Sequence, residues 1–465
     1  MDSFIRGRAL EWSATALLAL LIGFQILGPS PVGLADNGDF PKILGPEGIW
    51  PSAGSEQDRY RYFNPEYVVR DDRFYDVHIY SLERVFVRLA KFVALIVLPP
   101  GTFDLRILGV LHGVVLIAAG WLFFRATRGS PGWVRTGVAT LVIFILSDIQ
   151  YVQFLNTAYM DASAVVFCLL TLAVAANALR ESHPVWPLAF ALSSGLFLIS
   201  KLQHAVCALA LVLFCAAMML RKSAPVRSRY LWLVPVAAIL LAFNYIARKT
   251  PADFRADSVF GVVFGKLAPR DSQALSYFGF WPDDAKYTGL RNAFVDGSPM
   301  KDPAYRGYLL DRVPARKLAA YYLSHPAIVW DIVRTDLAAF GWDPSVRRLG
   351  KLRRLDNPQE RAQPAAFGWW SKWKAALLRA APLVPLILIG AVLLINAVLV
   401  RSTWTAPLLV LGSLMALLSL FVATLGDSSE TERHLILYHV ATDFIVTLLI
   451  VSGIFVWRNE ERLRT

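Results

Sequence analysis

The nearly uninterrupted apolar stretch WSATALLALLIGFQILG spans residues 12–28, and Asp36-Asn37-Gly38-Asp39-Phe40 lies just beyond it. A membrane-spanning helix needs about 20 mostly apolar residues, so the stretch predicts a first membrane helix. Arg6 and Arg8 precede this stretch, and positive charge before a span tends to stay in the cytoplasm. We therefore expect the two carboxylates, Asp36 and Asp39, to emerge at the opposite membrane surface, where they suggest chemistry on a lipid-borne substrate.

Composition indicates a polytopic membrane protein. Of the 465 residues, 56% are hydrophobic and 18% are charged, whereas a soluble domain averages about 45–50% apolar and about 25% charged residues. The net charge of +12 is typical of basic cytoplasmic loops, and we do not expect nucleic acid as a partner. Cys168, Cys207 and Cys215 all lie in apolar runs and predict neither disulfides nor a metal site.

We expect an all-α protein with about ten membrane helices. After the first, the apolar runs are 105–124, 134–146, 161–179, 185–199, 202–220, 230–246, 380–400, 405–425 and 436–457.

One further apolar segment, residues 82–98, carries Arg84, Arg88 and Lys91 on one helical face. That pattern favours an amphipathic helix in the membrane interface; re-entrant and spanning arrangements are the alternatives. If the segment does not cross, both termini and most basic loops are cytoplasmic, as the positive-inside rule favours.

This topology predicts three parts: an N-terminal transmembrane module (1–246) with an outer loop (29–104), an extracytoplasmic region (247–379) and C-terminal membrane helices (380–465). Helical periodicity predicts a small helical layer within 247–379, whose first half, punctuated by Pro251, Pro269, Pro282 and Pro299, reads as loop. Residues 1–35 also resemble a secretory signal peptide, but its removal would place the basic loops outside.

Polar residues gather at the helix ends that we expect to face outward, and such a set could converge into one polar cavity. Each one has a simpler interpretation. Asp36 and Asp39 suit a turn, Asp161 suits a helix start, and Lys201 suits snorkelling to head groups. The set comprises Asp36, Asp39, Asp148, Gln150, Tyr151, Asn156, Tyr159, Asp161, Lys201, Gln203, His204, Asp427, Glu430, Arg433 and His434, with His439 and Asp443 as an interacting pair on the last span.

Several of these motifs resemble the GT-C class of integral-membrane glycosyltransferases, which use polyprenyl-phosphate sugars. The acidic Asn37-Gly38-Asp39-Phe40 motif heads the outer loop, and residues 154–161 (FLNTAYMD) are similar to the Asn-Ser-Phe-Tyr-x-Glu element of bacterial surface-glycan hexose transferases. Asp161 stands where that element commonly has Glu. Residues 200–203 (SKLQ) resemble the Ser-Lys-x-Gln corner, and Gly426-Asp427 to His434 resembles the late Gly-Asp…His motif.

The resemblance implies a role for each residue in transferring a hexose or pentose to a glycan, lipid or protein acceptor. Asp39 is our first candidate for the general base and Asp36 the second. Lys201, Arg433 and His434 would stabilise the departing phosphate, with Arg84 or Arg88 holding the lipid phosphate. Sugar or acceptor would contact Asn156, Tyr159, Asp161, Gln203 and Asp148. Asp427 and Glu430 are candidate ligands of a divalent cation such as Mg, Mn or Ca.

Two other functions fit part of the pattern. A transporter or flippase also explains ten spans, but transporters usually place charge near the bilayer midplane within repeated, broken helices; here Asp443 is the nearest such residue. A glycan ligase or polymerase would draw support from the basic run at 347–354. The Arg, Ala and Leu content favours a bacterial inner membrane.

Overall fold

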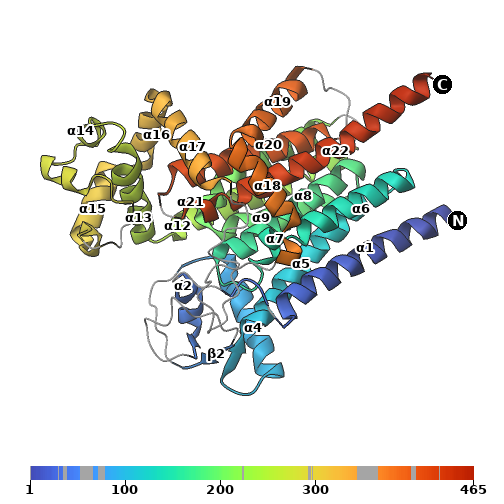
Figure 1. Cartoon of the computed structure of the whole chain (residues 1–465), viewed down its shortest axis with the longest axis horizontal. Helices are drawn as coiled ribbons and strands as arrows, with labels where there is room; N and C mark the ends of the chain where they lie inside the picture. The colour runs from blue at the N-terminus through green and yellow to red at the C-terminus, as the bar shows by residue number, and fades with distance from the viewer. Residues whose placement is uncertain are drawn as a thin grey trace.

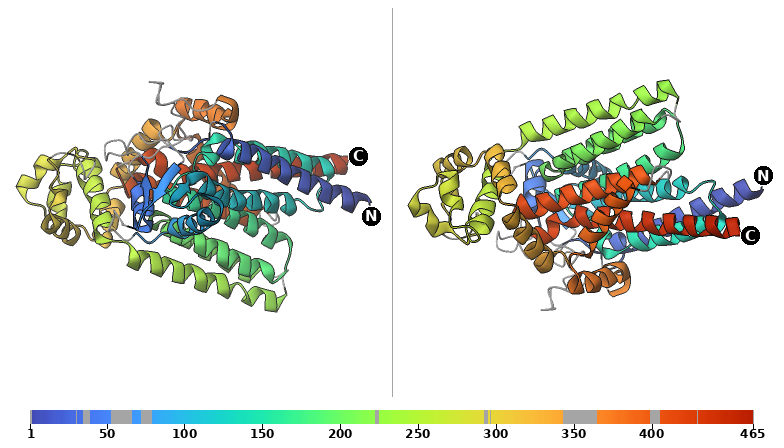
Figure 2. Two further views of the ribbon diagram at one scale, coloured as in Figure 1. Left: turned by 90° about the horizontal axis from the view of Figure 1, so that it is seen from below. Right: turned by 90° about the horizontal axis from the view of Figure 1, so that it is seen from above.

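The computed structural model describes residues 2–29, 31–34, 39–52, 66–71, 79–221, 225–291, 295, 297–342, 365–398, 405–428 and 430–464. A bundle of long apolar helices makes up most of this fold. A smaller group of helices packs on one end of the bundle, and both chain termini lie at the other end (Figures 1 and 2).

Every predicted span is a helix in the structure. The bundle helices are α1 (Asp2–Leu27), α5 (Leu105–Ala126), α6 (Gly132–Leu146), α8 (Met160–Arg180), α9 (Val185–Ser200), η2 with α10 (Leu202–Cys207 and Ala208–Leu220), α12 (Leu233–Lys249), α19 (Val384–Val398), α20 (Ala406–Leu425) and α22 (Ile436–Arg464). The short helices α7 (Ile149–Val152), α11 (Val226–Tyr230) and α21 (Thr431–His434) connect them.

Fewer of these helices than predicted are long enough to cross a membrane alone. Within the described residues, seven pass by length and composition, and α18 (Trp369–Ala380) with α19 would make an eighth if this bent pair is one span. The pair is bent by 91°, because Pro382 cannot continue a helix and disfavours helical geometry at Ala381. The two shorter apolar helices are α6 and α9.

The outer-loop segment contains a helix where one was predicted and a sheet where none was predicted. α4 (Leu82–Val97) starts at Ser81, whose hydroxyl accepts a hydrogen bond from the Glu83 amide, and it exposes apolar side chains such as Leu89, Phe92 and Ile96. It is not among the candidate spans found in the described residues. The strands β1 (Ile49–Pro51), β2 (Glu66–Val69) and β3 (Thr102–Asp104) form a small antiparallel sheet in that order. The predicted helical fold is confirmed, and this sheet is an addition to it that was not predicted.

The region after α12 folds as the predicted helical layer. Its elements are α13 (Ala252–Val262), the π-helical turn η3 (Val263–Leu267), α14 (Ala274–Phe278), η4 (Pro282–Tyr287), η5 (Pro299–Lys301), α15 (Pro303–Arg312), α16 (Ala315–Ser324) and α17 (Pro326–Phe340). The prediction that its first half is loop was wrong, because Pro251 precedes α13 and so leaves that helix intact.

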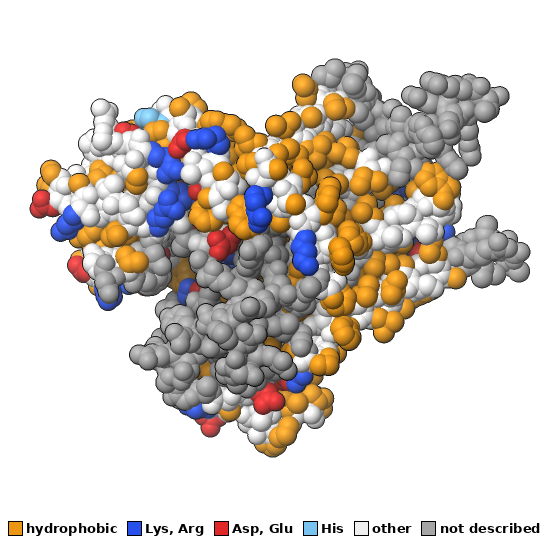
Figure 3. All heavy atoms as spheres, in the orientation of Figure 1, with side chains coloured by type: hydrophobic (Ala, Val, Ile, Leu, Met, Phe, Trp, Pro, Cys, Tyr) orange, Lys and Arg blue, Asp and Glu red, His pale blue; other side chains and the backbone are white. Residues whose placement is uncertain are grey.

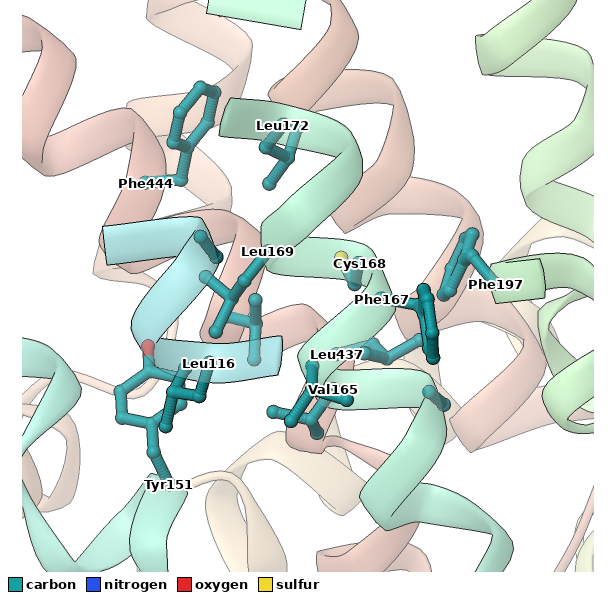
Figure 4. Close-up of a cluster of buried hydrophobic side chains, with 14 of the residues drawn as sticks. Leu116, Tyr151, Val165, Phe167, Cys168, Leu169, Leu172, Phe197, Leu437 and Phe444 are labelled. Atoms are coloured by element: carbon teal, nitrogen blue, oxygen red, sulfur yellow. The ribbon is translucent and has the colours of Figure 1, made fainter. Parts of the chain in front are cut away.

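Two separate cores hold the protein together. Side chains from α5, α8 and α22 fill the bundle, including Leu116, Phe167 and Leu437 (Figure 4), whereas Phe260, Phe264 and Tyr321 belong to the core of the helical layer. Apolar side chains cover much of the bundle surface, and charged ones gather mainly over the layer end of the face in Figure 3. An apolar outer surface is what lipid requires of a membrane bundle.

Two anchors fix the layer to the end of the bundle. Lys266 of η3 donates to Asp336 of α17 at 2.7 Å and to the carbonyl of Thr424 in α20 at 2.5 Å. Gly261 of α13 packs against Ser428, so closely that a β-carbon there would lie 2.1 Å from the serine hydroxyl. The residues after α20 are therefore held between the layer and the bundle.

Candidate active site

Arg433 is the centre of a cluster of charged side chains at this end of the bundle. It lies in α21, a helix that begins directly after Glu430. The φ of Glu430 is 50°, a left-handed value that no other described non-glycine residue has. Its Nη1 donates to Asp39 Oδ2 at 2.5 Å and its Nη2 lies 2.8 Å from Glu430 Oε2. Its Nε lies 3.5 Å from Asp161 Oδ2. One guanidinium thus faces three carboxylates.

A cation lies on the far side of two of these carboxylates. Lys42, one turn after Asp39, donates to Asp39 Oδ1 at 2.5 Å, and Lys201 donates to Asp161 Oδ1 at 3.0 Å. The charges alternate along the row Lys42, Asp39, Arg433, Asp161 and Lys201, which we call the charge row. Its members come from four distant parts of the sequence.

Local structure places each acid of the charge row. Asp39 occupies the N-cap position of α2 (Phe40–Leu44), but its side chain makes no capping hydrogen bond. Asp161 is in the first turn of α8, and Lys201, between α9 and η2, reaches it instead of the head groups. The turn, helix-start and snorkelling interpretations therefore do not account for these contacts.

Aromatic side chains line the charge row. The Arg433 guanidinium lies 4.9 Å from the centre of the Tyr159 ring, and Phe40 meets the same ring edge-on at 4.8 Å. Tyr159 is buried. A cation over an aromatic face is attracted by the ring quadrupole, so Tyr159 helps to hold Arg433 in place.

The two acids of the row differ in their access to solvent. The Asp39 side chain is 22% exposed and that of Asp161 is 2% exposed. Burial alone would raise the pKa of Asp39, but Arg433 and Lys42 outweigh it and hold the pKa well below its usual range. Burial lowers the pKa of Lys201, although Asp161 opposes this shift. Asp39 is thus ionised, accessible and firmly paired.

Three buried nitrogen atoms around the charge row make no hydrogen bond within the described residues. They are Arg433 Nε, His204 Nε2 and His434 Nδ1. His204 Nε2 lies 3.9 Å from Asp161, and His434 Nδ1 lies 3.5 Å from Asp427. Buried polar atoms are nearly always paired. Arg433 Nε is always a donor, so this atom suits a ligand that brings a hydrogen-bond acceptor, such as an anion; each histidine nitrogen can donate as well when it carries the proton.

Other predicted site residues lie in the protein framework. Asn156 donates to the carbonyls of Ile26 and Val32 at 3.1 and 2.9 Å, which ties the segment between α7 and α8 to the end of α1. Asp148 caps α7 through the Gln150 amide and accepts from the Ser371 amide at 3.0 Å. These contacts favour structural roles for both side chains.

The basic face of α4 contacts protein. Arg84 and Arg88 both donate to Glu47, at 2.7 and 3.0 Å, and Lys91 donates to the Glu47 carbonyl. The prediction that the three share one helical face is confirmed. Arg84 is engaged in anchoring α4, whereas Arg88 is largely exposed.

Gln203 lies two residues after Lys201. Its buried Oε1 has no hydrogen bond within the described residues.

Two predictions meet a different arrangement. The described residues contain no group of three or more His, Cys, Asp or Glu side chains that could hold a metal ion; Asp427 faces His434 and Glu430 faces Arg433. His439 does not pair with Asp443, which instead binds Lys374 at 2.7 Å. Asp36 and the basic run 347–354 lie outside the described residues.

Sequence patterns did not reveal three further charged residues near the row. Lys42 was inconspicuous as a single lysine. Lys266 and Asp257 lie in the layer, where no motif marked them. Asp257 is influenced electrostatically by Lys42 and Asp427, and burial raises its pKa to about 6 although Arg306 opposes the shift. A carboxyl group with such a pKa is suited to proton transfer near neutral pH.

The family comparison covers almost the whole chain. The model of the family described as the YfdI N-terminal transmembrane domain matches residues 6–465. The chain belongs to this family. Membership of a transmembrane family agrees with the apolar bundle and identifies the chain as an integral membrane protein.

Comparison with solved structures gives a weaker likeness. The crystal structure of the Archaeoglobus fulgidus oligosaccharyltransferase in the apo form is similar over 97% of this chain, with 12% identity and a TM-score of 0.42. The match covers 52% of that enzyme, so the chain spans about half its length. The comparison with curated proteins gave no match.

Proposed function

We propose that the protein transfers a monosaccharide from a polyprenyl-phosphate donor to an acceptor hydroxyl, and that the charge row is the active site. The observation that carries the proposal is the convergence of Asp39, Asp161, Lys201 and Arg433 at one end of an apolar bundle. These residues lie in the motifs that resemble the GT-C class. A polar site at the end of a membrane bundle suits a substrate that has a lipid tail and a charged head.

The proposed chemistry is a single displacement. A carboxylate oxygen of Asp39 takes the proton of the acceptor hydroxyl. The acceptor oxygen attacks the anomeric carbon, and the bond from this carbon to the phosphate oxygen breaks. The electron pair leaves with polyprenyl phosphate, and the anomeric configuration inverts. Asp39 then releases its proton to water.

Donor binding would also prepare the base. Asp39 is now a weak base, since Lys42 and Arg433 hold its pKa low. A donor phosphate brings acceptor oxygens to Arg433 Nε and to a protonated His434 Nδ1, which make no hydrogen bond within the described residues, and Lys201 adds charge that stabilises the leaving group. As Arg433 turns toward the phosphate, Asp39 loses a partner and becomes more basic.

The remaining residues would bind or position. Tyr159 and Gln203 would contact the sugar, and Asp161 would orient Arg433 and Lys201. Asn156, Asp148 and Arg84 would hold the framework. In the topology expected from the positive-inside rule, the site would face away from the cytoplasm. Both termini would face the cytoplasm of a bacterium, and the protein would lie in its inner membrane.

One observation favours a transporter instead. Lys374 and Asp443 form a charged pair inside the bundle, next to the bent pair α18–α19. Asp443 also accepts from Gln150, Tyr151 and Trp370. Both carboxylate oxygens of Asp443 thus accept hydrogen bonds from protein side chains. This favours a structural role over ion conduction, so we rank the transferase above the transporter.

The test is transfer from a labelled polyprenyl-phosphate hexose by purified protein in lipid. Asp39→Asn is expected to lower the rate by about 10²–10⁴-fold, the usual contribution of a general base, with donor binding retained. Asp311→Asn, which changes an exposed acid of the helical layer, is the matched control. Full activity of Asp39→Asn would refute the assigned base. Movement of labelled lipid across the bilayer without transfer would favour the transporter.

A further inference from the structure

A cavity of about 70 Å³ lies inside the bundle, away from the charge row. Helices α5, α6, α8 and α22 enclose it, and its lining includes Val142, Leu169, Ala176 and Leu448. Figure 4 shows Tyr151, Leu169 and Phe444 on one side of α8, among the residues that bound it. Most of these side chains are buried, whereas Phe123, Thr127 and Thr447 are half-buried, and the cavity is partly open to the surroundings of the bundle.

The polar side chains of the lining are already engaged. Thr127 donates to the Phe124 carbonyl at 2.7 Å and Thr447 to the Asp443 carbonyl at 2.8 Å. Tyr151 donates to Asp443 at 2.8 Å, and Lys374 donates to the other oxygen of that carboxylate. A polar ligand would find few partners here, and water needs two to four of them.

The cavity is large enough for part of a hydrocarbon chain. One water molecule requires roughly 10–15 Å³ on this measure of volume, so about 70 Å³ accommodates several methylene groups. Apolar cavities of this kind stay dry and bind apolar molecules. An alkyl chain would also restore the dispersion contacts that an empty space lacks.

Basic residues surround the end of the cavity that is remote from the charge row. The lining reaches Ala126 and Thr127 at the end of α5, next to Arg125, Arg128 and Arg180. Glu11 and Glu181 neutralise part of this charge: Arg128 and Arg135 pair with Glu11, and Arg125 pairs with Glu181. Arg128 and Arg135 thus share the single carboxylate of Glu11, and Arg180 donates to the carbonyl of Arg128. A cluster of arginines at a membrane surface attracts anionic head groups.

We propose that the cavity binds one acyl chain of an anionic phospholipid from the leaflet at the end with both termini, with its head group among Arg125, Arg128 and Arg180. The site is separate from the proposed active site and does not depend on the transferase assignment. The lipid would fill the space between α8 and α22. α8 contributes Asp161 to the charge row, and the short helix α21, which directly precedes α22, contributes Arg433.

The probe is phosphatidylglycerol with a diazirine in its acyl chain, applied to the full chain in mixed-lipid nanodiscs. We expect crosslinks in peptides that contain residues 138–146 and 440–451, about tenfold stronger than with the same chain on phosphatidylcholine. Ala176→Phe should abolish these crosslinks by filling the cavity. Leu192→Trp, a similar enlargement on an exposed part of α9, should leave them unchanged.

A second variant covers the case in which Ala176→Phe does not fold. Arg180→Gln changes an exposed side chain and should reduce the preference for phosphatidylglycerol while crosslinks in both peptides persist. Equal labelling by both lipids, or labelling spread over lipid-facing helices, would overturn the proposal. Displacement of the label by a polyprenyl phosphate, but not by unlabelled phosphatidylglycerol, would assign the cavity to an isoprenoid chain and also overturn it.

Discussion

Arg433 is the residue whose replacement tests the charge row most directly. Its three nitrogens point at three carboxylates, with Nη1 on Asp39, Nη2 on Glu430 and Nε near Asp161. Lysine keeps the charge but has one nitrogen on a flexible stem, so it cannot reproduce this fork. Arg433→Lys therefore separates the geometry of the cation from its charge, and Arg433→Gln removes both.

The structure sets the expected magnitudes. If the lysine keeps Asp39, it loses the 2.8 Å ion pair with Glu430, and a polar contact between charged groups contributes about 1.5–3 kcal/mol to stability. Arg433→Gln leaves the buried Asp161 with fewer cations; removing one partner of a buried ion pair costs about 3–5 kcal/mol. For transfer, losing one donor to a developing negative charge lowers the rate by about 10²–10³-fold.

The assay pairs two measurements on each variant. Denaturant unfolding in detergent gives the change in the free energy of unfolding, and transfer from a labelled polyprenyl-phosphate hexose gives the rate. Arg270→Lys is the control, because Arg270 pairs with the half-exposed Asp331 in the helical layer, and exposed pairs contribute about 0–1 kcal/mol. If Arg433→Lys matched the wild type in both measurements, the three-carboxylate arrangement would be wrong.

The other predictions concern the surroundings of the site. Asp257 has a pKa of about 6 in the fold, above its usual value of 3.8. The folded state therefore holds this proton more tightly than the unfolded state, and the free energy of unfolding should fall as pH rises from about 4 to about 6. Asp257→Asn should remove this fall in a pH series of thermal unfolding, and an unchanged slope would contradict the shift. Lys374→Met should lower the free energy of unfolding by about 3–5 kcal/mol, because Asp443 stays buried without its cation. The double variant with Lys374→Met and Asp443→Leu should lose less stability than Lys374→Met alone. Additive losses in urea unfolding would show that the two side chains do not interact. Gly261→Val should lower the melting temperature, since its β-carbon would lie 2.1 Å from the Ser428 hydroxyl, and an unchanged melting temperature would mean that α13 does not pack on this loop.

Much of the architecture followed from the sequence because membrane helices carry their own signal. Each apolar run of suitable length became a helix, since the backbone in lipid has to satisfy its own hydrogen bonds. α4 was found from the spacing of its basic residues, which one helix face explains. The strands β1 to β3 were missed because runs of three or four residues give no periodic signal.

The residues of the candidate site were found by motif, but their partners were not. Asp39, Asp161, Lys201 and Arg433 had been singled out from separate stretches, whereas Lys42 and Asp257 had not. Asp443 had been matched with His439, four residues away. The structure instead brings Lys374 to Asp443 from α18, and no local pattern encodes such a distant contact.

By itself, the sequence determined a chain of apolar helices, an outer segment rich in polar residues and a set of acids and bases at helix ends. Hydrophobicity and local spacing are enough for this, because both act within a single helix. Only the tertiary structure decided that Arg433 lies between Asp39 and Asp161, that Asn156 and Asp148 contact the framework, and that an apolar cavity lies between α8 and α22. Those outcomes depend on which helices pack together, and packing is decided by side chains from all parts of the chain at once.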